Sequence, residues 1–104
     1  MQIFDLKDMN AFPYEQRDKN VFYSAPELKT RIIQLKPGET MPECEMKSKV
    51  MFYALSGSAD ININNEKGTL KEGCCLISGP GLFKMSSING TRLLGIQIAN
   101  NILP

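Results

Sequence analysis

Apolar and polar residues alternate along most of the chain, in short runs that Gly, Pro and Asn residues separate. Successive side chains of a β-strand point to opposite faces, so this alternation predicts strands with one buried face. We expect such strands over residues 1–6, 19–25, 28–35, 41–48, 50–55, 58–65, 74–78, 82–88 and 91–99. No run predicts a helix longer than a turn or two. Many short strands at regular spacing are typical of a β-sandwich or β-barrel.

The run over residues 41–48 has its sulfur-containing and its acidic side chains on opposite faces. Pro42, Cys44 and Met46 share one parity, and Glu43 and Glu45 share the other. Because the first set is the more apolar, we expect Cys44 and Met46 to face inward and the carboxylates to face solvent. A register slip of one residue would reverse this arrangement.

The run VMFYAL over residues 50–55 is apolar on both parities. A strand buried on both faces needs something packed on each side. In a small barrel the second layer is either the facing sheet or another subunit, so the pattern predicts a homodimer. We expect the tail over residues 99–104 to be a loose end or a further dimer contact.

Two turns are predicted from residue type. Residues 65–68, with the sequence Asn-Glu-Lys-Gly, should close the strand over residues 58–65. Asn89-Gly90, flanked by apolar runs, predicts a β-hairpin between the last two strands.

Length and charge narrow the class of protein. A chain of 104 residues forms one domain, which we place over residues 1–104. The formal net charge of +1, with acids and bases interspersed, lacks the basic surface expected of a nucleic-acid-binding protein and gives no reason to propose a membrane surface. The first eight residues lack the apolar core of a signal peptide, and no run has transmembrane length. We therefore expect a cytoplasmic protein.

The cysteine and histidine content excludes several kinds of metal site and catalytic site. The three cysteines include the adjacent pair Cys74-Cys75, which is a poor disulfide framework and suits a reducing compartment. The chain has no histidine. This removes His-ligated zinc or iron, Ser-His and Cys-His nucleophile pairs, and imidazole acid–base catalysis.

The spacing of glycines in the middle of the chain resembles the first signature of the cupin superfamily, in which a glycine is followed by His, His, Glu and a second glycine. Gly38 and Gly57 match the two glycines, and the metal-ligand positions between them fall on Cys44, Met46 and Val50.

The later part of the chain resembles the second cupin signature. Gly73 opens it, Gly79-Pro80-Gly81 forms its turn, and Asn89 falls near its asparagine. The fourth ligand, a histidine in the family, corresponds to Lys84. The resemblance covers about residues 28–99, which would form the cupin core of the domain.

Similarity to cupins implies an all-β fold, namely a double-stranded β-helix or jelly-roll barrel, with a central pocket and commonly a homodimer. In most members that pocket holds a divalent metal on three His and one Glu. None of these ligand types is present here, so the metal-dependent activities of the family do not carry over. We expect no bound metal or other cofactor.

The residues at the former ligand positions define a candidate ligand-binding pocket. It comprises Cys44, Met46, Val50 and Lys84, with Phe52 and Ala54 on the parity of Val50. An apolar pocket with one cation suits a small anionic or carbonyl-bearing molecule. The favoured interpretation is therefore a metal-free binding or sensing module. The alternative is a barrel filled by its own side chains, with Lys84 extending to the mouth.

Other functions remain open. An enzyme could use a soft metal site of Met41, Cys44 and Met46, which favours Cu(I), or Glu43 and Glu45 after a register slip. Lys84 could act as a nucleophile if it were desolvated. A third possibility is an interaction or structural protein that functions through the strand over residues 50–55 and its dimer. Cys74 and Cys75 point to opposite faces of a strand, so they cannot both serve one pocket.

Overall fold

A computed structural model describes residues 1–99 of the chain, and the fold is all-β with one short helical segment. Residues 100–104, which include most of the predicted tail contact, lie outside the described residues. The elements in chain order are the 3₁₀ helix η1 (Tyr14–Asn20) and the strands β1 (Val21–Ser24), β2 (Leu28–Leu35), β3 (Thr40–Met46), β4 (Lys49–Ile63), β5 (Glu66–Lys71), β6 (Cys75–Ser78), β7 (Gly81–Ser86) and β8 (Thr91–Ile98). Within residues 1–99, no helix has the length and apolar character needed to cross a membrane.

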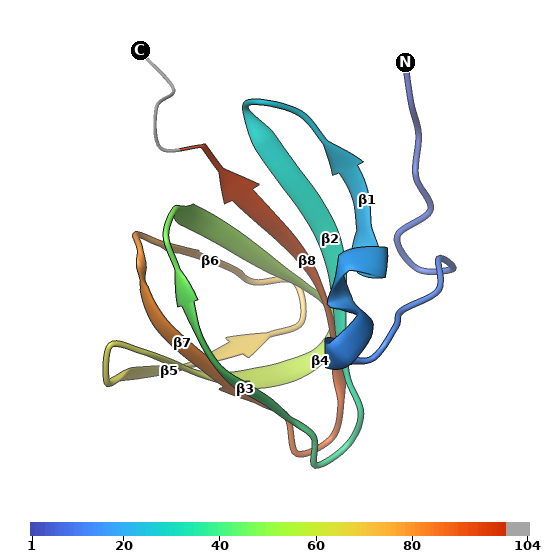
Figure 1. Ribbon diagram of the computed structural model, residues 1–104. Coiled ribbons are helices and arrows are strands. Elements are labelled where there is room, and N and C mark those ends of the chain that lie inside the picture. The colour runs from blue at the N-terminus through green and yellow to red at the C-terminus, as the bar shows by residue number, and fades with distance from the viewer. Residues whose placement is uncertain (100–104) are drawn as a thin grey trace.

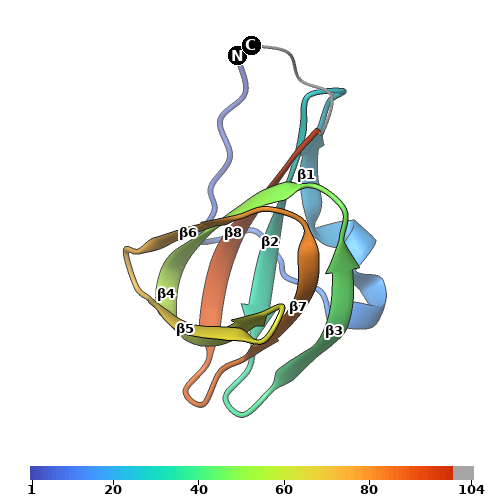
Figure 2. The same cartoon turned by 90° about the vertical axis from the view of Figure 1, so that its left-hand side faces the viewer.

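The strands form two antiparallel sheets that curl into one barrel (Figures 1 and 2). The first sheet runs in the order β1, β2, β8, β4 and β6, and the second in the order β3, β7, β4 and β5. Strand β4 belongs to both, because its first half pairs with β8 and β6 and its second half with β7 and β5. This pairing of strands distant in sequence confirms the predicted jelly-roll barrel.

Strand β4 continues through Gly57, where two separate strands were expected. Its register against β8 shifts between Ala54 and Ser56, and Gly57 has a φ of 69°. A Cβ atom at Gly57 would lie 2.0 Å from the carbonyl oxygen of Gly90. Only glycine fits this bend, and the bend lets one strand serve both sheets.

The core lies between the two sheets. The inward residues of the first half of β4, Val50, Phe52 and Ala54, are buried. The ring of Phe52 meets that of Phe83 from the opposite sheet edge-on, with centroids 5.9 Å apart. The outward residues Met51 and Leu55 are half-buried and Tyr53 is exposed, so one face of this apolar strand has no complete cover within residues 1–99.

The N-terminal residues form no strand, and the prediction over residues 1–6 is wrong. The side chain of Ile3 is 88% exposed, whereas the ring of Phe4 packs on that of Phe22 of β1, with centroids 4.9 Å apart. The segment is held instead by Arg92, whose guanidinium group donates to the carbonyl oxygens of Leu6 and Met9. Because Arg92 lies on β8, this contact fixes the segment over the outer side of the first sheet.

Both turn predictions are corrected. The β4–β5 hairpin turns at Asn64 and Asn65, which have positive φ values of 50° and 69°, rather than over residues 65–68. Two consecutive positive φ values are typical of a type I′ turn. Asn89-Gly90 does not close a hairpin, because β7 pairs with β3 and β4 whereas β8 pairs with β2 and β4. That connection crosses from one sheet to the other.

Candidate functional site

A cavity of about 250 Å³ lies inside the barrel between β2 and β3, two strands that do not pair with each other. Helix η1, with Phe12 before it, forms one wall of the cavity, and the inner faces of β2 and β3 form two more. The remaining wall comes from β4 and β8, which contribute Phe52, Gly95 and Gln97. Helix η1 lies beside β3 at this open side of the barrel (Figure 2). The cavity therefore lies where the two sheets fail to close and the N-terminal helix covers the gap.

Arg31 is the half-buried cation of this cavity. It lies on the inner face of β2, opposite Gly95 of β8, which itself pairs with Phe52 of β4. A Cβ atom at Gly95 would come within 3.2 Å of the Phe52 ring and 3.3 Å of Ile33, so little room exists there for a larger residue. The glycine thus lets Phe52 and Ile33 pack close to the backbone of β8 opposite Arg31.

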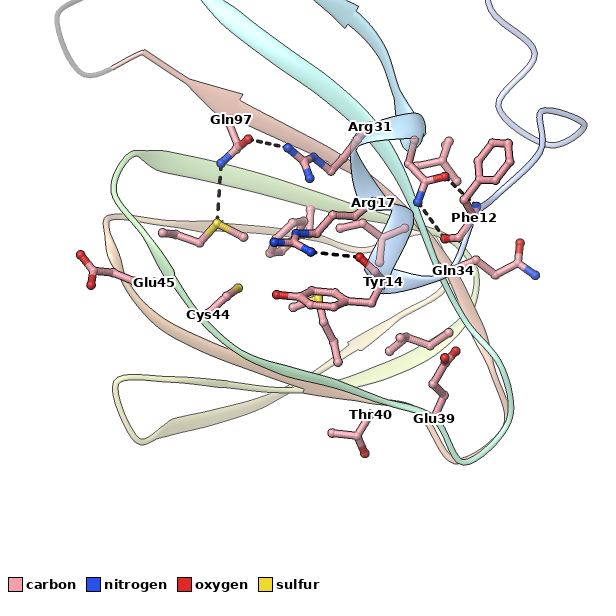
Figure 3. A pocket seen from close by; sticks show the side chains of 18 residues that line it. Phe12, Tyr14, Arg17, Arg31, Gln34, Glu39, Thr40, Cys44, Glu45 and Gln97 are labelled. Carbon is pink, nitrogen blue, oxygen red and sulfur yellow. Dashed lines mark hydrogen bonds between the residues drawn. The ribbon is translucent and has the colours of Figure 1, made fainter.

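Burial lowers the pKa of Arg31 below its ordinary value, an effect that Asp18 opposes and Arg17 adds to. A guanidinium group keeps its proton in proteins, so Arg31 carries a positive charge at neutral pH. Its Nη2 donates to Oε1 of Gln97 over 3.1 Å. The amide nitrogen of Gln97 in turn contacts Sδ of Met46 at 3.6 Å, so Gln97 joins β2 and β3 across the top of the cavity (Figure 3).

The helical wall is fixed by Asn20, which is only 7% exposed. Its Oδ1 accepts the backbone N–H of Phe12 over 2.7 Å, and its Nδ2 donates to the carbonyl oxygen of Phe12 over 3.0 Å. One side chain thereby satisfies both backbone groups of a residue eight positions earlier, as a strand partner would. These bonds hold the segment before η1 against the barrel.

Helix η1 adds a second guanidinium group to the cavity. Tyr14 packs against the core, and the guanidinium carbon of Arg17 lies 4.3 Å from the centre of its ring. Nη1 of Arg17 also donates to the carbonyl oxygen of Tyr14 over 3.1 Å. Tyr14, Arg17 and Arg31 point into the cavity from two elements (Figure 3).

The thiol of Cys44 is half-buried on the β3 side of the cavity. Burial raises the pKa of the Cys44 thiol, while Arg17 and Arg31 lower it in part and Glu43 raises it further. The charges of both arginines therefore reach this thiol, which is consistent with all three side chains lining one cavity. Because its pKa is raised, Cys44 is a neutral thiol at neutral pH and a poor nucleophile.

Of the six residues predicted to form the pocket, Cys44, Met46 and Phe52 line the cavity, whereas Ala54 is completely buried and does not. Val50 is completely buried in the core and does not line it.

Lys84 is also outside the cavity, and its expected position is wrong. It is exposed on β7 between the buried residues Phe83 and Met85, which occupy the inner face of that strand. Strand alternation therefore turns Lys84 outward. It borders a separate, open hollow on the outer side of the second sheet.

The acidic alternative for a metal site receives no support from the fold. Glu43 and Glu45 are both exposed, and Glu45 points away from the cavity (Figure 3). Residues 1–99 contain no group of three or more His, Cys, Asp or Glu side chains that could hold a metal ion. As predicted, Cys44 and Met46 thus face inward, and the carboxylates of both glutamates face outward.

A bulge in β3 brings a third sulfur to the cavity. The register of β3 against β7 shifts between Met41 and Cys44, so Met41 is buried and Pro42, expected inward, is exposed. Proline is tolerated at such a bulge because no ladder hydrogen bond is needed there. Met41, Cys44 and Met46 all line the cavity, as the soft-metal alternative requires.

The adjacent cysteines lie elsewhere. Cys74 and Cys75 are exposed, and Cys75 pairs with Tyr53 at the edge of the first sheet. Neither lines the cavity.

The site predicted from the sequence did not include Arg31, Arg17, Tyr14 or Gln97. A signal existed for Arg31, because it shares strand parity with Ile33 and Leu35 in the run over residues 28–35. A charged residue on the apolar face of a strand is unusual and marks a candidate site. No comparable pattern indicated that η1 would cover the barrel.

The fold and cavity together define a small jelly-roll barrel with an internal pocket. No family model matches the chain, and no curated protein sequence matches it significantly. The structure is similar to that of a Thermus thermophilus protein, with a TM-score of 0.78, 20% identity and coverage of 94% of this chain and 97% of that one.

Two solved cupin structures are also similar. An RmlC-like cupin from Desulfovibrio desulfuricans has a TM-score of 0.76 and 13% identity, with 94% of this chain and 96% of that one covered. A cupin from Bacteroides fragilis has a TM-score of 0.65 and 25% identity, with 75% and 70% covered. The chain has the cupin fold, which confirms the resemblance found in the glycine spacing.

Proposed function

We propose that the protein is a metal-free cupin barrel that binds a small anionic molecule, with Arg31 as the group that holds the anion. The observation that carries this proposal is the half-buried guanidinium of Arg31, which lines the cavity. The anionic ligand expected from the sequence is retained, while the cation that would hold it changes from Lys84 to Arg31.

The bonding of Arg31 supports this choice. A guanidinium group has five N–H donors, and within residues 1–99 Arg31 uses one of them, toward the neutral amide of Gln97 rather than a carboxylate. A buried charge is costly unless it is paired. A carboxylate or phosphate oxygen pair matches the guanidinium fork and would supply the missing partner.

The rest of the cavity suits an apolar body. Ile33, Leu35, Met41 and Phe52 line it with aliphatic, thioether and aromatic surface. Its volume of about 250 Å³ lies below the ~300–1,000 Å³ typical of drug-sized ligands, so the ligand should be compact. A small carboxylic acid with an aromatic or branched body meets both requirements.

Cys44 provides a test of occupancy. In a variant with Cys74→Ser and Cys75→Ser, iodoacetamide alkylation should report on the cavity alone, because both replaced thiols are exposed. We expect benzoate, phenylacetate or 4-methylpentanoate to slow this alkylation, and the matching neutral amides to slow it far less.

Two further substitutions separate the candidate cations. Arg31→Met should abolish the protection that the carboxylates give, whereas Lys84→Met should leave it unchanged. Failure of all three carboxylates to protect Cys44, or equal protection in the Arg31→Met variant, would contradict the proposal.

We also propose that the protein forms a homodimer through the outer face of β8, β4 and β6. On this face Tyr53 is 36% exposed and lies opposite Leu94, while Ile77 is 67% exposed and lies opposite Met51. These side chains are uncharged, so a second copy can oppose the same face without charge repulsion. Ile77→Lys should convert a dimer to a monomer in light scattering, and a wild-type monomer at micromolar concentration would refute this.

A further inference from the structure

We propose that the anion in this cavity is doubly charged and is held by two guanidinium groups, Arg31 from the barrel and Arg17 from η1. This inference rests on the proposed function, because it specifies the ligand of the same cavity. A monoanion would satisfy Arg31 alone, whereas a phosphate monoester or a dicarboxylate carries enough charge for both arginines.

The first support is the position of the two cations. Arg17 and Arg31 reach the cavity from η1 and from β2, and both line it (Figure 3). Arg17 lowers the pKa of Arg31, so the two positive charges interact unfavourably with each other. An anion between them would replace this repulsion with two attractions.

The second support is that, among residues 1–99, no carboxylate accepts a hydrogen bond from either arginine. Within residues 1–99, the hydrogen-bond acceptors of the two arginines are the amide oxygen of Gln97 and the carbonyl oxygen of Tyr14. Asp18 raises the pKa of Arg31 through its charge, but it forms no hydrogen bond with Arg31. Most N–H donors of both groups thus remain for a ligand.

The acidic residues at the cavity wall are engaged elsewhere or turned away. Glu39 accepts the backbone N–H of Lys36 over 2.8 Å through its Oε1, which ties its carboxylate to the β2–β3 turn. Glu45 points out of the barrel (Figure 3). The end of the cavity near Arg31 and Gln97 is therefore its cationic end.

Arg17 also has a preorganised geometry. The contact of its guanidinium carbon with the Tyr14 ring at 4.3 Å and the hydrogen bond to the Tyr14 carbonyl oxygen hold this exposed side chain at the cavity wall. A planar group that is already ordered loses less entropy when it binds. The two hydrogen bonds from the Asn20 side chain to the backbone of Phe12 hold the segment that carries Tyr14, so the position of Arg17 depends on them as well.

The test compares ligands that share a ring and differ in charge. Benzoate has one negative charge, whereas phenyl phosphate at pH 8 and benzene-1,3-dicarboxylate each carry about two. Calorimetry on the full chain should show both dianions binding more tightly than benzoate. A preference for one dianion over the other distinguishes a phosphate from a dicarboxylate source.

Arg17→Met should weaken the dianions about tenfold, the effect of one charge-assisted hydrogen bond, and leave benzoate within about twofold. Arg17→Lys should restore part of the loss. Lys19→Met is the matched control, because Lys19 also stacks on a ring of this wall, that of Phe12 at 5.5 Å, but does not line the cavity.

The outcomes separate the two proposals. If benzoate binds through Arg31 while the dianions gain nothing, or if Arg17→Met and Lys19→Met weaken the dianions equally, the two-arginine site is wrong and the proposed function stands. If neither monoanions nor dianions bind, both proposals are wrong.

Discussion

Arg31 and Arg92 allow a direct comparison of a binding arginine with a structural one. Arg92 donates to the carbonyl oxygen of Leu6 over 2.8 Å, to Oε1 of Gln34 over 2.7 Å, and to the carbonyl oxygen of Met9. Arg31 has one acceptor, Gln97, at 3.1 Å. We predict that Arg92→Met strongly destabilises the protein and that Arg31→Met does not.

The magnitudes follow from these contacts. Each hydrogen bond contributes about 1 kcal/mol net, so Arg92→Met should lower the free energy of unfolding by about 3 kcal/mol. It would also release the N-terminal segment from the barrel. Arg31→Met loses about 1 kcal/mol from one hydrogen bond, but it removes a desolvated charge, whose attraction to Asp18 is offset in part by its repulsion by Arg17, while the methionine keeps the apolar contacts of the stem. We expect a change between zero and a gain of about 1 kcal/mol, as is common at binding sites.

Urea unfolding followed by far-ultraviolet circular dichroism measures both free energies on the ligand-free protein. The two variants lose the same charge and gain the same side chain, so net charge and side-chain type are matched. A destabilisation of Arg31→Met as large as that of Arg92→Met would refute the reasoning. Arg31 would then be a structural arginine, and the main support for an anion site would be lost.

Further predictions concern the bend, the thiol and metal content. Gly57→Ala should lower the free energy of unfolding by more than about 3 kcal/mol in urea, because left-handed strain adds to the 2.0 Å contact with Gly90. Gly38→Ala, with a φ of 80° but open space around its Cβ, should cost only about 1 kcal/mol, and equal losses would contradict this account. The raised pKa of Cys44 contributes stability that is complete below the thiol pKa of the unfolded chain, about 8.5, and is lost as pH rises through the folded value. In the same urea assay, Cys44→Ser should therefore become more stable relative to wild type as the pH rises from 7 to 9.5. The prediction is wrong if the difference in free energy of unfolding between the two proteins is the same at both pH values. Elemental analysis of protein purified without chelators should find no stoichiometric metal, whereas copper would favour the sulfur site of Met41, Cys44 and Met46.

The sequence predicted most strands because their patterns are local. Strand β2 has the predicted bounds, since its eight residues end next to Pro37-Gly38. Strand pairing depends on contacts between residues distant in sequence, which explains why the hairpin predicted at Asn89-Gly90 is wrong. The dipeptide favours a tight turn, but a Cβ atom at Gly90 would lie 3.3 Å from the carbonyl oxygen of Leu35 and from the ring of Pro37, so this connection passes close to the β2–β3 turn. Tertiary contact, rather than residue type, fixes that connection.

The site shows where family spacing and strand parity disagree. The cupin signature placed Lys84 in the pocket, but the apolar neighbours Phe83 and Met85 already predicted that Lys84 faces outward. The parity argument was the correct one, and the same argument applied to β2 would have pointed to Arg31. The position of η1 and of the segment before it could not be predicted from the sequence. It depends on hydrogen bonds from the Asn20 side chain to the backbone of Phe12, and the N-terminal segment is also held by Arg92, which is distant in sequence.

The chemistry of the cavity suits the binding of an anion. A metal in a cupin pocket supplies both a positive charge and open coordination positions, and Arg31 and Arg17 can replace only the charge. The chain has no histidine, and the Cys44 thiol has a raised pKa, so neither offers a proton acceptor at neutral pH. The carboxylate of Glu39 is bound to a backbone N–H of its turn. Two permanent cations that line one cavity together with apolar side chains can hold an anion, and this supports the proposed binding role.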